Sequence, residues 1–161
     1  MASGDAQILI LGSMPGRASL NAVEYYAHPR NVFWSIMAAL LNFDINQRYA
    51  LRCGALKSSG VALWDVLRSC RRAGSLDTAI DPTSAEANDF SVFLQRQRKL
   101  RALFFNGAAA EALYRRHVLP GLGPSTFKYA RLPSTSPAHA ALTFEEKLRA
   151  WRAALLPHLR R

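Results

Sequence analysis

Four short apolar runs, separated by helix-forming segments, constrain the fold of this chain more than any other feature. The runs cover residues 7–12 (QILILG), 61–67 (VALWDVL), 101–107 (RALFFNG) and 128–133 (KYARLP). Continuous apolar runs of this length are typical of buried parallel strands. Their alternation with helices predicts a sheet that is covered on both faces. We therefore expect a single α/β domain over residues 1–161, a three-layer α/β/α sandwich around a short four-stranded parallel sheet.

The helix-forming segments between these runs carry their own signals. They cover residues 32–41, 47–60, 85–100, 108–119 and 143–159. Asn31 stands where an N-cap belongs, directly before the first of them. The second contains glycines, which predict a broken helix that ends near Gly60. At the start of the last, Thr143 and Glu146 match a capping box.

The balance of charge indicates an anionic partner. The chain has 21 Lys and Arg residues, most of them Arg, against 11 Asp and Glu residues, for a formal net charge of +10. The arginine side chain suits phosphate recognition because its planar fork can donate two parallel hydrogen bonds. A generic solubilising surface would also be charged but needs no such excess of one sign. Charge therefore favours nucleic acid as the partner.

The sequence also limits where the protein works and what it needs. No stretch approaches the roughly 18 apolar residues of a membrane span. The start lacks the basic segment of a signal peptide, so we expect a cytoplasmic protein of bacterial type, working at the nucleoid. Cys53 and Cys70 stand 17 positions apart without a Cys-x-x-Cys motif. They predict two reduced cysteines rather than a metal site, and we expect a monomer without cofactor, metal or membrane partner.

Two of the segments that follow the strands look suited to a ligand. In GSMPG (residues 12–16) the glycines allow close approach and the proline stiffens the turn, whereas Met14 offers no acid, base or strong hydrogen bond. STSPAHA (residues 134–140) offers hydroxyls on a rigid loop, which suit phosphate oxygens. Either segment alone could be a plain turn. Because ligands bind beyond the carboxyl ends of parallel strands, we expect these loops to converge on one site.

Three segments together resemble a known family. ILGSMPGRAS…YYAHPRNVFW, FFNG and LPSTSPAHA, in this order, are similar to the motifs of the uracil-DNA glycosylase superfamily. The version present here looks most like its hypoxanthine-DNA glycosylase branch, family 6. The resemblance implies hydrolysis of the N-glycosidic bond of a deaminated base, hypoxanthine before uracil or xanthine, which is flipped out of double-stranded DNA to leave an abasic site. It implies no cofactor.

The resemblance also implies roles for individual residues. Asn31 matches the catalytic asparagine of this branch, although a helix cap alone would explain it. Tyr26 would stack on the flipped base, or be a half-buried core tyrosine. Asn106 would read the base edge, since an amide offers both a donor and an acceptor, or would simply form a turn before glycine. The backbone at Ser13 and Met14 would bind the base.

A further set of residues is expected to contact DNA: Gly12, Pro15, Gly16, Arg17, Arg30, Ser134, Thr135, Ser136, Pro137 and His139. At His139 the branch more usually has asparagine, which leaves phosphate contact, base contact and leaving-group stabilisation open. Met14 replaces the Asp or Asn that orients water in most of the superfamily. A non-catalytic nucleic-acid-binding module is therefore the alternative function. An enzyme acting on free nucleosides is disfavoured, because a nucleoside has no phosphate for the arginines to hold.

Overall fold

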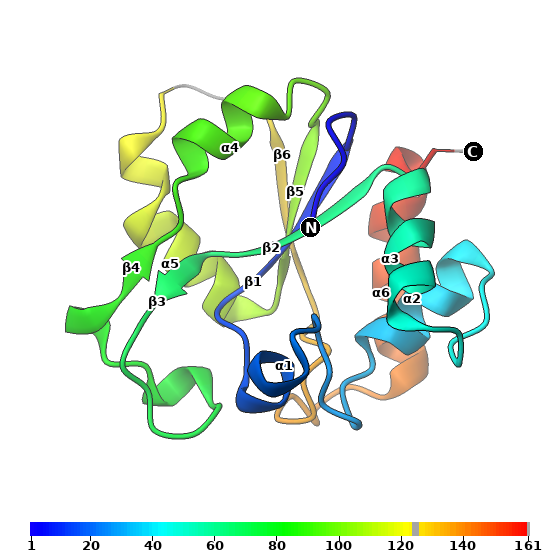
Figure 1. Cartoon of the computed structure of the whole chain (residues 1–161), viewed down its shortest axis with the longest axis horizontal. Coiled ribbons are helices and arrows are strands. Elements are labelled where there is room, and N and C mark those ends of the chain that lie inside the picture. The colour runs from blue at the N-terminus through cyan, green and yellow to red at the C-terminus, as the bar shows by residue number, and fades with distance from the viewer. Residues whose placement is uncertain (124–125, 161) are drawn as a thin grey trace.

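A sheet of four parallel strands forms the centre of the molecule (Figure 1). The computed structural model describes residues 1–123 and 126–160. The strands are β1 (Ile8–Gly12), β2 (Val61–Asp65), β5 (Ala102–Asn106) and β6 (Lys128–Leu132). They lie in the order β2-β1-β5-β6, and each neighbouring pair is parallel. The structure thus confirms the four predicted strands and their parallel arrangement.

Helices cover both faces of the sheet. They are α1 (Arg17–Ala22), α2 (Phe33–Leu41), α3 (Tyr49–Ser58), α4 (Phe90–Arg96), α5 (Ala108–His117) and α6 (Phe144–Leu155). In Figure 1, α2, α3 and α6 lie on one side of the sheet and α4 and α5 on the other. Single-turn 3-10 helices lie in the loops between these elements and after α6: η1 (Asp77–Ala79), η2 (Pro82–Ser84), η3 (Leu119–Gly121) and η4 (Leu156–His158).

Alternating side chains of β1 explain why both faces are covered. Ile8 and Ile10 are fully buried in one apolar cluster, together with Trp151 of α6. Leu9 and Leu11 are fully buried in the second cluster, which includes Tyr114 of α5. A strand with apolar residues on both faces is stable only between two layers of helices. This arrangement confirms the predicted three-layer sandwich.

Two predicted elements have different bounds in the structure. The run at residues 61–67 is two strands, because the chain leaves the main sheet after Asp65 and continues as β3 (Leu67–Ser69), which pairs antiparallel with β4 (Glu86–Ala87). The helix expected over residues 85–100 is only α4. It starts late because the Asp89 side chain accepts a hydrogen bond from the Val92 N–H and caps it there.

Two helix signals can be compared directly with the structure. Gly54 lies within α3 without breaking it, so the prediction of a broken helix was wrong, but the helix does end near Gly60. The capping box is confirmed: the Thr143 hydroxyl accepts from the Glu146 N–H, and the Glu146 carboxylate accepts from the Thr143 N–H. Helix α3 therefore ends, and helix α6 begins, where the local sequence predicts.

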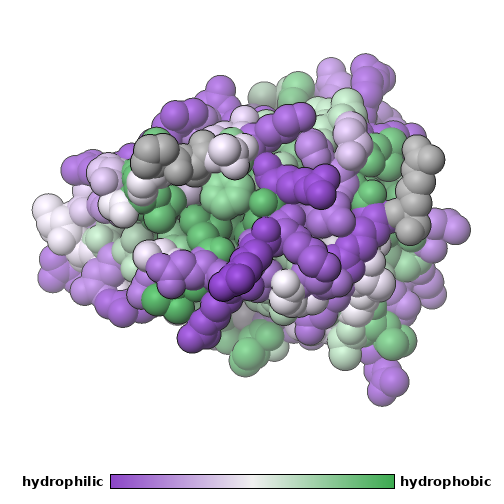
Figure 2. All heavy atoms as spheres, turned by 90° about the horizontal axis from the view of Figure 1, so that it is seen from above, coloured by the Kyte–Doolittle hydropathy of each residue, from purple (hydrophilic) through white to green (hydrophobic). Residues whose placement is uncertain are grey.

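Figure 2 shows the end of the molecule at which the strands begin, and hydrophilic side chains there interrupt the hydrophobic areas. No helix within residues 1–123 and 126–160 has the length and apolar character needed to cross a membrane. Across the same residues, no cluster of three or more His, Cys, Asp or Glu side chains is placed to hold a metal ion. Cys53 and Cys70 are both free thiols.

Candidate active site

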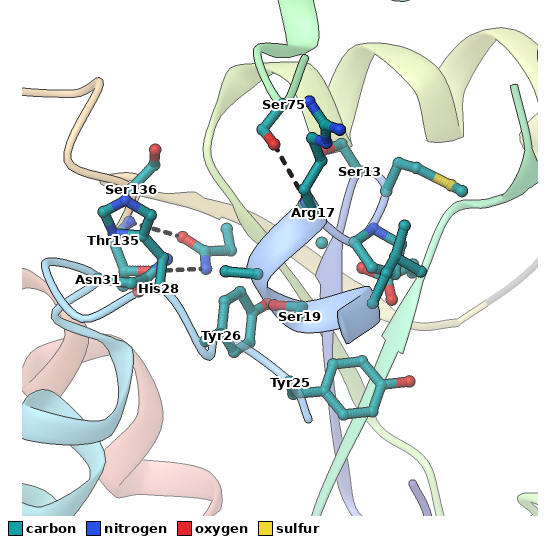
Figure 3. A pocket seen from close by; sticks show the side chains of 18 of the residues that line it. Ser13, Arg17, Ser19, Tyr25, Tyr26, His28, Asn31, Ser75, Thr135 and Ser136 are labelled. Atoms are coloured by element: carbon teal, nitrogen blue, oxygen red, sulfur yellow. Dashed lines mark hydrogen bonds between the residues drawn. The ribbon is translucent and has the colours of Figure 1, made fainter. Parts of the chain in front are cut away.

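The loops after β1 and β6 and the last residues of β2 and β5 meet around a cavity of about 660 Å³. The predicted convergence of these loops on one edge of the sheet is thereby confirmed. Figure 3 shows Asn31 and Thr135 on one side of the cavity, Ser13 and Arg17 on the other, and Tyr26 between them. The predicted site residues that line the cavity are Gly12, Ser13, Met14, Pro15, Gly16, Arg17, Tyr26, Arg30, Asn31, Asn106, Ser134, Thr135, Ser136 and Pro137.

The turn after β1 is fixed by two residues that the sequence did not single out. The Ser13 hydroxyl donates to Asp77 Oδ1 at 2.6 Å. The guanidinium of Arg72 donates to the Pro15 carbonyl at 2.6 Å and lies 3.7 Å from Asp77. Met14 is partly buried and packs against the apolar cluster on the α4 and α5 side of the sheet. Met14 thus anchors the turn by packing, while Asp77 and Arg72 hold its polar groups.

Tyr26 lies in an unusual backbone conformation that places its ring in the cavity. Its φ of 55° is in the left-handed region, which is uncommon for a residue with a bulky side chain. The ring stacks on Phe33, with 4.1 Å between ring centroids. Burial, and then the nearby Asp65 carboxyl, raise the pKa of the Tyr26 hydroxyl, so it stays protonated. The Tyr25 carbonyl accepts from Trp34 Nε1 at 2.8 Å and anchors the neighbouring backbone.

The Asn31 amide has one half committed to the fold. Its Oδ1 accepts a hydrogen bond from the Phe33 N–H at 3.0 Å. The N-cap position of α2 is Val32 rather than Asn31, so the predicted cap was one residue early, although the side chain does hold the first turn. Within the described part of the chain, Asn31 Nδ2 makes no hydrogen bond. Asn31 therefore combines a structural contact with a free donor at the cavity.

Asn106 is engaged by the loop that follows β6. Its Nδ2 donates to Thr135 Oγ1 at 2.8 Å, and its Oδ1 accepts from the Thr135 N–H at 2.9 Å. Thr135 is buried, and its carbonyl accepts from the Val32 N–H. The amide that was expected to read a base edge therefore also clamps the loop, while its second N–H, near the Tyr26 hydroxyl, and one lone pair take no part in the clamp.

The loop after β6 is a series of serine turns. The Ser134 hydroxyl accepts from the Ser136 N–H, and the Ser136 hydroxyl accepts from the Ala138 N–H, each at 3.2 Å. Both hydroxyls keep their own hydrogen for a ligand. His139 lies beyond the cavity lining, where its carbonyl accepts from Lys147 Nζ at 2.7 Å. His139 stays a predicted DNA contact, but outside the cavity.

Asp65, at the end of β2, is a cavity residue that the sequence analysis missed. The residue is only 8% exposed. Burial, reinforced by Asp77, raises the pKa of its carboxyl to about 7, against the opposing effects of the Met1 amino group and Arg72. A signal was present, because Asp65 is the polar residue at the end of an apolar run, in the same position as Gly12 of β1. Asp65 differs from the predicted site residues in that it belongs to no glycine- or serine-rich segment.

The mouth of the cavity is basic and partly apolar. Arg17 and Arg30 are exposed there, and neither forms an ion pair with another described residue. Leu20 and Val23, at 54% and 85% exposure, lie on the same rim. Free guanidinium groups beside exposed apolar side chains fit a polyanion that also offers flat apolar surfaces, as nucleic acid does.

The family of this chain follows from comparison with known proteins. A model of the uracil-DNA glycosylase superfamily matches residues 2–160. The chain belongs to this superfamily. Members of known sequence include a hypoxanthine DNA glycosylase of Methanosarcina acetivorans, 35% identical over 136 residues, which cover 84% of this chain and 82% of the relative. The resemblance deduced from the three motifs is thus confirmed.

Two further glycosylase relatives agree with this assignment. A hypoxanthine DNA glycosylase of Methanosarcina barkeri is 38% identical over 104 residues, and the match spans 64% of this chain and 65% of that relative. The solution NMR structure of a Methanosarcina acetivorans protein, provisionally assigned as a uracil DNA glycosylase, superposes with a TM-score of 0.78. It is 31% identical in sequence, and the match covers 95% of this chain and 91% of that one. The superfamily fold therefore extends over nearly the whole chain.

Proposed function

We propose that this protein is a DNA glycosylase that hydrolyses the N-glycosidic bond of a deaminated base, hypoxanthine first, in double-stranded DNA. One observation carries the proposal: the strand ends of a superfamily member enclose a cavity of about 660 Å³ lined by an aromatic ring, amides and hydroxyls. That volume is within the range of small-molecule sites. The two Methanosarcina relatives named as hypoxanthine DNA glycosylases support the choice of base.

The base is held, in this proposal, between an aromatic face and polar groups. The ring of Tyr26 is fixed from behind by Phe33, so its orientation is set before the base arrives. Stacking on such a ring contributes roughly 1–3 kcal/mol per base. The second N–H and remaining lone pair of Asn106 complement a lactam edge, and backbone N–H groups at Ser13 and Met14 supply further donors.

Asn31 is proposed as the catalytic amide. The Phe33 N–H fixes its Oδ1, and this contact sets the orientation of the whole side chain in the cavity. The unengaged Nδ2 can then donate to the sugar, to the base or to a water molecule near the anomeric carbon. A positioned donor acts most strongly where charge develops in the transition state. Met14 cannot orient water, so Asn31 is the residue on which this chemistry depends.

The surrounding surface is proposed to hold the DNA strand. The free guanidinium groups of Arg17 and Arg30 supply cations at the mouth, and the Ser134 and Ser136 hydroxyls supply donors for phosphate oxygens. Thr135, Pro137 and the turn formed by Gly12, Pro15 and Gly16 shape the loops, and His139 extends the surface. Since one chain lines the whole cavity, we propose a monomer acting in the cytoplasm on nucleoid DNA.

A direct assay separates this proposal from a non-catalytic binding module. The protein is incubated with duplexes that each contain one inosine, uracil or xanthine, and abasic sites are then cleaved with alkali. We expect strand cleavage at inosine, and none in an undamaged duplex. Binding of all these duplexes without any cleavage would instead support the binding module. Cleavage at uracil alone would retain the enzyme but change its substrate.

A further inference from the structure

Asp65 is a buried carboxyl for which the fold gives no structural reason. It lines the cavity, and among the described residues its side chain is acted on by burial and by charges at a distance, with no hydrogen bond or ion pair to its carboxyl group. The other carboxyls of the cavity differ, because Asp77 accepts from Ser13 and Glu24 lies 3.7 Å from Arg52. A buried polar group without a partner costs free energy, so such a group points to function rather than to stability.

The position of Asp65 decides which part of a nucleotide it meets. It pairs in register with Gly12, where a Cβ atom would lie 2.4 Å from Asp65 Oδ1 and 3.3 Å from the Tyr26 hydroxyl. The carboxyl therefore lies deep in the cavity beside the stacking ring, whereas Arg17 and Arg30 are exposed at the mouth. A flipped nucleotide enters base first while its phosphates stay outside. Asp65 thus faces the base rather than the sugar.

Burial, more than the charges around it, favours the protonated form of Asp65 near neutral pH. Burial raises the pKa of its carboxyl to about 7, and Asp77 acts in the same direction. The Met1 amino group and Arg72 oppose the rise without cancelling it. Asp65 also acts electrostatically on the hydroxyls of Tyr25 and Tyr26, and burial raises the pKa of each, so both stay neutral. A general acid works best when its pKa is close to the working pH.

We propose that protonated Asp65 is a catalytic residue that gives its proton to the departing base. The bond from C1′ to the base nitrogen breaks, and its electron pair leaves with the base. The Asp65 proton passes to an acceptor atom of the base, which departs neutral. The oxygen of a water molecule bonds to C1′, and the proton that this water loses restores the Asp65 carboxyl. This inference rests on the proposed glycosylase activity.

The test is a pH profile of the chemical step. Single-turnover release of hypoxanthine from an inosine duplex is measured between about pH 5 and about pH 9. We expect the wild-type rate to fall as the pH rises through about 7. Asp65→Asn, which can donate a hydrogen bond but cannot transfer a proton, should be about 100-fold slower at the acidic end, with a flat profile. Asp89→Asn makes the same chemical change at a distant helix cap and should match the wild type.

The possible results of this experiment distinguish a failed inference from a failed proposal of function. An Asp65→Asn variant with the wild-type rate and profile would overturn the inference, as would a wild-type rate that rises through pH 7. If the wild type releases no base from any duplex, the proposed function itself has failed, and the inference fails with it. Circular dichroism and binding of the inosine duplex show whether Asp65→Asn is folded. If Asp65→Asn is not folded, the direction in which the wild-type rate changes with pH still tests the inference.

Discussion

Asn106 and Thr135 are joined by two hydrogen bonds, of 2.8 and 2.9 Å, that tie the end of β5 to the loop after β6. Because Thr135 is buried and its carbonyl also accepts from Val32, the pair connects three segments of the cavity wall. A residue at the position of a base reader is here also a structural clamp. The two roles predict different mutational effects.

Replacing Thr135 by valine removes one of the two hydrogen bonds of the clamp, because the bond from the residue 135 N–H to Asn106 Oδ1 does not involve the hydroxyl. We expect Thr135→Val to destabilise the fold by about 1–3 kcal/mol, because a buried amide N–H loses its acceptor. Asn106→Ala should cost a similar amount of stability but lose more excision activity, since it also removes the proposed base contact. Thermal unfolding and single-turnover excision measure both. Equal losses of activity in the two variants would show that Asn106 acts as a clamp alone.

Gly12 is predicted to tolerate no side chain. A Cβ atom there would lie 2.4 Å from Asp65 Oδ1, so Gly12→Ala must displace the carboxyl. Overpacking of this kind costs about 1–3 kcal/mol, and excision should fall as well. Gly54→Ala is the matched control, because its Cβ meets nothing within 4 Å and an alanine favours the helix. Chemical denaturation should show a loss for the first variant and a gain for the second.

The raised pKa of Asp65 has a consequence for stability that does not involve DNA. Its carboxyl titrates near pH 7 in the folded protein and near 3.8 when exposed. The folded state therefore holds this proton more tightly than the unfolded state does. The stability that the bound proton contributes is complete below a pH of about 3.8 and is lost as the pH rises towards about 7. The loss is about 1.4 kcal/mol per pH unit. Denaturation at several pH values should show a flatter curve for Asp65→Asn, with greater stability than the wild type above pH 7.

Salt dependence tests the two arginines at the mouth. Each phosphate contact contributes about 0.9 to the slope of log affinity against log salt concentration for duplex DNA. Arg17→Gln and Arg30→Gln should each reduce the slope by about 1, whatever the sequence of the duplex. Arg98→Gln, also exposed but in the loop before β5, should leave the slope unchanged. A similar reduction at Arg98 would place the DNA elsewhere.

Local chemistry explains how far the sequence could predict this structure. The apolar runs predicted the four main strands, because a strand buried on both faces needs continuous apolar residues. The capping box of Thr143 and Glu146 could also be predicted, since such a cap depends only on residues close together in the chain. The β3–β4 pair was not, because its two short strands carry no apolar run and depend on a tertiary contact.

In the candidate site, too, features set by local sequence could be predicted and features set by tertiary contacts could not. Glycine-, proline- and serine-rich loops predicted where the cavity would lie. Asp65, Arg72 and Asp77 were missed, because their importance arises from burial and from contacts between distant segments. A helix cap and a catalytic amide were predicted for Asn31 as alternatives, and only the folded structure shows that the contact from the Phe33 N–H to Oδ1 leaves Nδ2 unengaged.

The central claim is that the cavity excises a base through Asn31. The most direct measurement is single-turnover release of hypoxanthine from an inosine duplex by the wild type and by Asn31→Ala, with duplex binding measured in parallel. We predict release by the wild type and a loss of at least about 100-fold in the variant, with binding retained. Release by Asn31→Ala at the wild-type rate would contradict the account.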